Sequence, residues 1–75
     1  MLNEIVTKIL LVEEDQITND LSRDDVEEWD SMTHLVLISE LEQEFNVVFS
    51  DDEIADVQDV GGLRNLLAKY GVENV

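Results

Sequence analysis

The segment Asp30-Ser31-Met32 carries the hydroxyl group best placed to do chemistry in this chain. A serine in the first turn of a helix, directly after a long loop, is exposed and accessible to other molecules. The first backbone N–H groups of a helix lack partners within it, and the helix dipole is positive at that end. A phosphate group attached to Ser31 would therefore be stabilised where it sits. The alternative is that Asp30 or Ser31 only caps the helix.

Other kinds of catalytic or metal site have weaker support. The chain has no cysteine, which excludes disulfides, zinc–thiolate sites and a cysteine nucleophile. His34 is the single histidine. A hydrolase built on Ser31 and His34 is disfavoured, because the two lie three residues apart on one predicted helix and no oxyanion loop is recognisable. We expect no metal site, because one acidic cluster lacks the ligand spacing and central glycine of a calcium loop: Asp51, Asp52, Glu53 and Asp56.

The length of 75 residues predicts one small domain, spanning 1–75. Hydrophobic residues make up 44% of the chain, enough for one modest core. No apolar run is longer than Leu35–Ile38, which is too short to span a bilayer. The first eleven residues lack the basic segment and long apolar stretch of a signal peptide. We therefore expect a soluble, cytoplasmic monomer.

The strong negative charge limits the kinds of partner. Four basic residues stand against 19 acidic ones, so the net charge is 4 − 19 = −15. Such a surface repels nucleic acids and anionic membranes. It favours docking to basic patches on other proteins, with a strong dependence on salt. A surface that only maintains solubility would show the same charge.

The apolar spacing predicts an all-α fold. A first helix is expected over residues 2–12, on a stripe formed by Leu2, Ile5, Val6, Ile9 and Leu10. A second is expected from Ser31 to Phe45, with Asp30 as N-cap. Its core side contains Leu37, Ile38, Leu41 and Phe45, with His34 at the edge of this stripe as a half-exposed polar residue. Met32 and Val36 fall on the solvent side and are interpreted as a docking spot.

Two further helices follow. Ser50 and Glu53 form a capping box that predicts a short helix over Asp51–Asp56. Asp59 is expected to cap the last helix, and Gly71 to occupy the left-handed position after it. The buried stripe of that helix is predicted to be Leu63, Leu66, Leu67 and Tyr70. Together these segments predict a small four-helix bundle of three longer helices and one short one.

A long loop over residues 13–30 separates the first two helices. It shows no sustained period, and loops of such length are commonly functional. Ile17, Leu21 and Val26 are spaced as anchors to the core, so we expect an ordered loop with one short helical turn. Trp29, at its end, is interpreted as packing on the end of the bundle.

The segment Trp29–Leu35 and the acidic helix after it resemble the Asp-Ser-Leu signature region of the acyl carrier protein family. The capping box at Ser50 and the helix start at Asp59-Val60-Gly61-Gly62-Leu63 are similar to that family's third and fourth helices. The resemblance covers nearly all 75 residues. The three-residue signature is weak alone and becomes fairly specific together with the length, acidity and helix order.

The resemblance implies a carrier protein that is not itself an enzyme. A separate phosphopantetheinyl transferase would attach 4′-phosphopantetheine from coenzyme A to Ser31, between Asp30 and Met32. The thiol of this arm would carry acyl groups as thioesters to partner enzymes of fatty acid, polyketide or other specialised acyl biosynthesis. The residues implied to shelter an acyl chain are Leu37, Ile38, Leu41, Phe45, Ile54, Leu63 and Leu67. Those implied to dock on basic partners are Met32, Val36, Glu40, Glu42 and Glu44.

The sequence departs from the family pattern near the serine. Glu28 stands where glycine is frequent, Trp29 where a small residue is frequent, and Met32 in place of leucine. Val36 stands where the main fatty-acid members commonly have an acid. These departures favour a specialised carrier. A peptidyl or aminoacyl carrier, or an unmodified acidic interaction domain, remain the alternatives.

Overall fold

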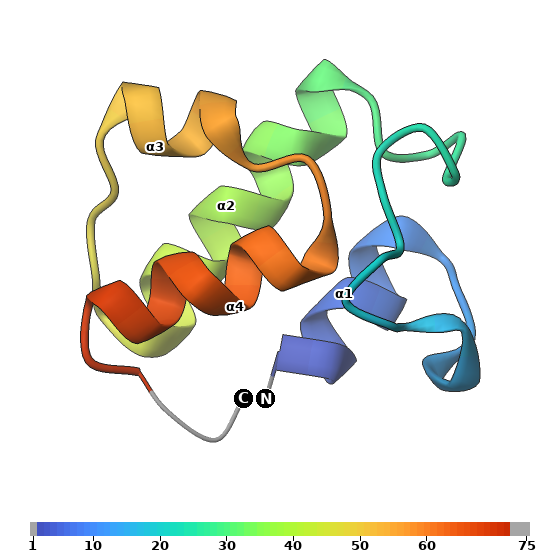
Figure 1. Ribbon diagram of the computed structural model, residues 1–75, viewed down its shortest axis with the longest axis horizontal. Coiled ribbons are helices and arrows are strands. Elements are labelled where there is room, and N and C mark those ends of the chain that lie inside the picture. The colour runs from blue at the N-terminus through green and yellow to red at the C-terminus, as the bar shows by residue number, and fades with distance from the viewer. Residues whose placement is uncertain (1, 73–75) are drawn as a thin grey trace.

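The computed structural model describes residues 2–72 (Figure 1). In order, these residues form α1 (Leu2–Leu10), the 3₁₀ turn η1 (Glu14–Gln16), α2 (Ser31–Phe45), α3 (Asp51–Asp56) and α4 (Val60–Lys69). No β-strand is present in this part of the chain; its only extended pairing is an isolated bridge between Ser22 and Asp59. The predicted all-α bundle of three longer helices and one short helix is confirmed.

Helix α1 is shorter than its apolar pattern predicts. The expectation that it continues to Val12 is wrong, because Leu11 has a φ of 57° and leaves the helical conformation. The N–H of Leu11 still donates to the carbonyl of Thr7 at 3.0 Å, which closes the last turn. The side chain of Leu11 is 75% exposed. Hydrophobic periodicity could not locate this end, since Leu11 and Val12 continue the apolar run.

The other helices begin at the predicted caps. Oδ1 of Asp30 accepts the N–H of Thr33 at 2.8 Å, and Oδ1 of Asp59 accepts the N–H of Gly62 at 2.7 Å. The capping box at the start of α3 is present as predicted. Asn46 ends α2 in the left-handed conformation, and Gly71 follows α4 with a φ of 85°.

The loop between α1 and α2 is ordered and held to the start of α4. Ile17 and Val26 are buried and Leu21 is half-buried, as the anchor spacing predicts. The carbonyls of Asn19 and Leu21 accept the N–H groups of Gly61 and Val60 at 2.9 and 3.0 Å. A Cβ atom on Gly61 would lie 3.0 Å from the carbonyl oxygen of Asn19, so the loop needs glycine there to approach the helix this closely.

The core lies between α1, α2 and α4 and takes in the loop anchors. Leu2, Leu10, Leu37, Leu41 and Leu67 are fully buried in it. Figure 1 shows α2 crossing behind α3 and α4, with α1 on the loop side of the molecule. Packing of this one core therefore places the start of α2, the loop and α3 near one another.

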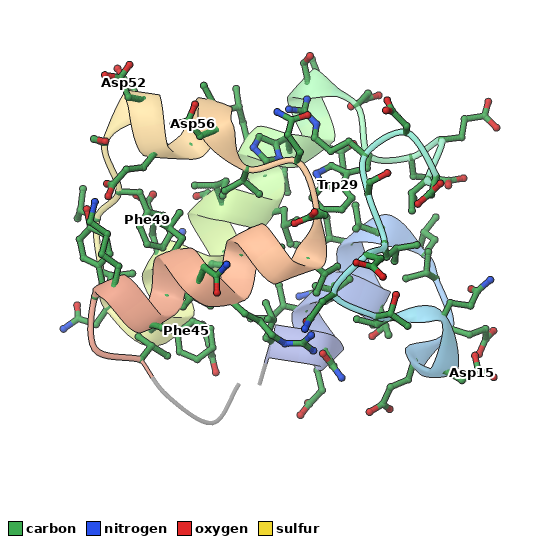
Figure 2. The ribbon with its side chains drawn as sticks, viewed as in Figure 1. Asp15, Trp29, Phe45, Phe49, Asp52 and Asp56 are labelled. Atoms are coloured by element: carbon green, nitrogen blue, oxygen red, sulfur yellow. The ribbon has the colours of Figure 1, made fainter. Side chains whose placement is uncertain are left out.

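Tyr70 is not part of the core, contrary to its place in the predicted stripe. Its side chain is 38% exposed, because α4 ends at Lys69 and Tyr70 no longer follows the helical rotation. Its ring packs edge-on against Phe49 with ring centroids 5.2 Å apart (Phe49 is labelled in Figure 2). The Tyr70 hydroxyl donates a hydrogen bond to Glu53 in α3 at 2.5 Å.

Glu53 joins the short helix α3 to the end of α4. Its carboxylate accepts hydrogen bonds from the backbone N–H of Ser50 at 2.9 Å and from Nζ of Lys69 at 2.5 Å, besides that from Tyr70. The hydrogen bond from Lys69 contributes most to lowering the pKa of Glu53 to about 2, followed by that from Ser50. The charged form of Glu53 is therefore favoured in the folded state.

We expect Glu53→Gln to lower the thermal midpoint at pH 7, and the difference from wild type to become smaller in acid. The pKa of Glu53 is depressed on folding, so its contribution is complete above the ordinary value of 4.5 and is lost as the pH falls towards 2. Circular dichroism melts between pH 7 and pH 2.5 measure this. Glu44→Gln, on the exposed side of α2, removes the same charge as a control. Equal midpoints for the two variants at pH 7 would contradict the role of Glu53.

Candidate functional site

Ser31 is the first residue of α2, and its side chain is exposed. Asp30 performs the capping, because its carboxylate binds the N–H of Thr33. This hydrogen bond also holds the pKa of Asp30 below its usual range. The Ser31 hydroxyl makes no hydrogen bond to any residue between 2 and 72. Of the two capping alternatives, the structure therefore assigns the cap to Asp30 and leaves Ser31 available for attachment of a group.

A surface depression of about 350 Å³ lies beside Ser31, between the start of α2 and α3. It has an apolar part and a polar part. Its lining residues are Arg23, Ser31, His34, Leu35, Asp51, Ile54 and Ala55. A group attached to Ser31 would thus find both apolar surface and charged side chains within reach.

His34 is buried behind this depression, which corrects the expectation of a half-exposed residue. Only 4% of it is exposed. Its Nδ1 accepts the indole N–H of Trp29 at 2.9 Å, and its Nε2 lies 2.9 Å from the carbonyl oxygen of Ile54. The two rings are stacked, with centroids 6.1 Å apart. His34 therefore links the end of the loop to α2 and α3. His34 was expected at the edge of the apolar stripe because it is polar. A polar side chain can be fully buried when its hydrogen-bonding atoms have partners.

The hydrogen-bond partners determine the protonation state of His34. The indole nitrogen of Trp29 can only donate, so Nδ1 of His34 is unprotonated and Nε2 carries the hydrogen that is donated to Ile54. Burial is the main cause that lowers the pKa of His34, and the charge of Arg23 lowers it further, against the effect of the Ile54 carbonyl. The imidazole is thus neutral, and its one basic nitrogen, Nδ1, is already bound to Trp29, so it has no free lone pair with which to accept a proton from Ser31.

Trp29 packs on the end of the bundle, as expected, and is 2% exposed. It occupies the last part of the loop before Asp30 (labelled in Figure 2). Its backbone N–H also donates to the carbonyl of Val26 at 3.0 Å. The residue before the Asp-Ser pair is therefore fixed from the core side, which in turn fixes where α2 begins.

An exposed apolar patch follows Ser31 along α2. Met32 is 78% exposed, Leu35 60% and Val36 50%. Together with Ser39 and Glu40 they line a second depression of about 340 Å³. The helical rotation correctly predicts the exposure of Met32 and Val36. The exposure of Leu35 was not predicted, although the same helical rotation places Leu35 next to Met32 around the helix.

The three glutamates of α2 have different surroundings. Glu44 is exposed and Glu40 is half-buried next to the apolar patch. The carboxylate of Glu42 accepts the backbone N–H of Phe49 at 2.9 Å. Glu42 therefore holds the connector between α2 and α3, whereas Glu40 and Glu44 have no such bond within residues 2–72.

The residues implied to shelter an acyl chain divide into two groups. Leu37, Ile38, Leu41, Leu63 and Leu67 are at most 1% exposed and pack tightly in the core. Phe45 and Ile54 are half-buried at its boundary. Ile54 also lines the depression beside Ser31. Ile54 is thus where this set of residues meets the surface next to Ser31.

The acidic residues of α3 have different surroundings, since Glu53 binds Lys69 and Tyr70 and Asp51 lines the depression beside Ser31. Asp52 and Asp56 point away from the bundle (Figure 2). Within residues 2–72, no three histidine, aspartate or glutamate side chains are grouped so that they could hold a metal ion. None of the helices in the same range is long and apolar enough to cross a membrane.

Comparison with known proteins supports the sequence resemblance. No family model matches the chain. The chain is 35% identical over 66 residues to the acyl carrier protein of Petrotoga mobilis, and the match covers 88% of this chain and 78% of that protein. The chain belongs to the acyl carrier protein family.

Proposed function

We propose that the protein is a non-catalytic carrier whose Ser31 holds a 4′-phosphopantetheine arm. The observation that carries the proposal is the free, exposed Ser31 hydroxyl at the start of α2, in a chain of the acyl carrier protein family. The thiol of the arm would supply the chemistry, binding acyl groups as thioesters for delivery to partner enzymes. A chain with no cysteine has no thiol of its own. A single domain over 1–75, working as a cytoplasmic monomer, suffices for this role.

The residues around Ser31 fit such an arm. Asp30 caps the helix and leaves the serine hydroxyl free, and Met32 is exposed on its other side. The depression of about 350 Å³ offers room next to the attachment point. For an acyl chain, Ile54 is the proposed point of entry towards Leu37, Leu41 and the other core leucines. Since these are closely packed, a long chain must displace them.

Incubation with coenzyme A, magnesium and a broad-range phosphopantetheinyl transferase tests the proposal. We expect the intact mass to rise by one 4′-phosphopantetheine group and no more. A known carrier protein, loaded in the same tube, shows that the enzyme is active. An unchanged mass beside a loaded control would reject the carrier function and favour an acidic interaction domain. If the protein does load, mass spectrometry of protein from the native cell would identify the group that the arm carries.

The partners are proposed to be enzymes with basic docking patches: the transferase, and enzymes that activate, condense or transfer acyl groups. They would bind α2 through Glu40 and Glu44 and through the apolar patch at Met32, Leu35 and Val36. Glu42 was grouped with these docking residues, and its carboxylate is already bound to Phe49. Reversing its charge would disturb the connector as well as the surface, so it is a poor probe of docking.

We expect the double variant Glu40→Lys/Glu44→Lys to reduce kcat/KM of the transferase about tenfold or more at low salt, because charge complementarity speeds association. The reduction should shrink as salt screens the charges. Glu14→Lys/Asp15→Lys, on exposed residues of η1, makes the same charge change away from α2. Equal kcat/KM for the two double variants would remove α2 as the docking surface. Val36→Glu, which places a charge on the apolar patch, should weaken binding without this salt dependence.

A further inference from the structure

Arg23 is a half-buried cation in the loop, and its side chain lines the depression beside Ser31. Its backbone N–H donates to the carbonyl of Gln58 at 2.9 Å, which fixes the residue against the segment between α3 and α4. Its charge is near enough to His34 to affect that ring. Arg23 and Ser31, eight positions apart in the sequence, thus share one small surface site.

The guanidinium of Arg23 forms no hydrogen bond or ion pair with any residue between 2 and 72. This is unusual in a chain with 19 acidic residues. Two of the other three cations are engaged: Lys69 binds the carboxylate of Glu53, and Arg64 binds asparagine side chains of α1 and the loop. Lys8 is exposed on α1. Arg23 is therefore the cation that faces the Ser31 site with its binding capacity unused.

We propose that Arg23 is the counterion of the phosphodiester that joins the arm to Ser31, and that it holds the base of the arm in the depression between α2 and α3. The inference rests on the proposed function. Guanidinium groups bind phosphate oxygens through paired, charge-assisted hydrogen bonds. The phosphodiester would add a negative charge to a chain already at −15, close to Asp30 and to Asp51. A cation at this point offsets the repulsion.

The remainder of the depression suits the part of the arm beyond the phosphate. Leu35, Ile54 and Ala55 supply apolar surface on its walls. Pairing at Arg23 would direct the arm along this surface towards α3, and not towards Met32 and Val36 on the outer side of α2. Arg23 acts here as a positioning residue, with no part in the chemistry of the thiol.

The test compares loaded wild type with loaded Arg23→Gln and Lys8→Gln by ³¹P NMR. The two variants lose the same charge, but Lys8 is outside the depression. We expect the ³¹P resonance to shift in Arg23→Gln and to stay at the wild-type position in Lys8→Gln. At about 1 M salt, where charges are screened within about 3 Å, the wild-type resonance should move towards that of Arg23→Gln.

A second measurement needs no variant. The Nε–Hε resonance of Arg23 should shift between unloaded and loaded wild type, and the indole N–H of the single Trp29 should follow through His34. An Arg23 resonance unchanged by loading, or identical ³¹P resonances in the three loaded proteins, would overturn the inference and leave the carrier function standing. Failure of the wild type to load at all would overturn both.

Discussion

Replacing Ser31 with alanine is expected to abolish loading with 4′-phosphopantetheine completely and to leave the fold unchanged. The hydroxyl is the proposed attachment point, so no partial loading should remain. It makes no hydrogen bond within residues 2–72 and is exposed, so its loss should change the free energy of unfolding by no more than about 0.5 kcal/mol. Intact mass after incubation with the transferase measures the first effect, and urea unfolding measures the second.

Two matched variants separate attachment from helix capping. Ser39→Ala removes another exposed hydroxyl from α2 and should load as wild type does. Asp30→Ala removes the cap and should lower the urea midpoint clearly. If Ser31→Ala destabilised the protein as much as Asp30→Ala, Ser31 would be a capping residue after all. A mass increment that persisted in Ser31→Ala would place the attachment elsewhere.

His34→Leu is expected to be the most destabilising substitution near the site, at about 2–4 kcal/mol. Leucine fills a similar space but leaves the buried indole N–H of Trp29 without a partner. It also removes one of the two hydrogen bonds that the carbonyl of Ile54 accepts, the other coming from the N–H of Val57 at 3.4 Å. Each buried group left unsatisfied costs about 1–3 kcal/mol. For a domain of this size, every kcal/mol corresponds to roughly 4–8 °C, so the thermal midpoint should fall by at least about 8 °C. Circular dichroism melts at pH 7 measure the change.

The pair Trp29 and His34 can be tested as a double-mutant cycle. Trp29→Phe alone removes the donor and leaves Nδ1 of His34 unpaired. In the double variant Trp29→Phe/His34→Leu both polar partners are gone, so its loss should be smaller than the sum of the two single losses by about 0.5–3 kcal/mol. Strict additivity would mean that the hydrogen bond between the rings contributes nothing specific. Thr33→Ala, beside His34 on α2, is a control that leaves both rings in place.

The local elements of this protein could be read from the residue pattern because their signals are local. The cap at Asp30, the capping box at Ser50 and Glu53 and the cap at Asp59 each lie within three residues of the groups they bind. The apolar spacing likewise gives the core side of α2, since an exposed or buried position follows directly from 100° of rotation per residue. The motif around Ser31 could be identified for the same reason.

Where the pattern failed, contacts between distant segments decided the outcome. His34 is buried because Trp29 and Ile54 satisfy both of its ring nitrogens, and Ile54 is 20 positions away. The carboxylate of Glu42 accepts the backbone N–H of Phe49, a contact that the rotation of α2 does not predict. Tyr70 left its predicted stripe because α4 ends one residue earlier.

The sequence alone therefore determined the four-helix order, the helix starts and the place of Ser31 at the start of α2, because caps and periodicity act over a few residues. Only the tertiary structure decided what surrounds that hydroxyl. It brought Arg23, His34 and Ile54 from the loop, α2 and α3 to one depression beside Ser31. Such a meeting depends on how three separate segments pack on a shared core, and no spacing along a single segment encodes it.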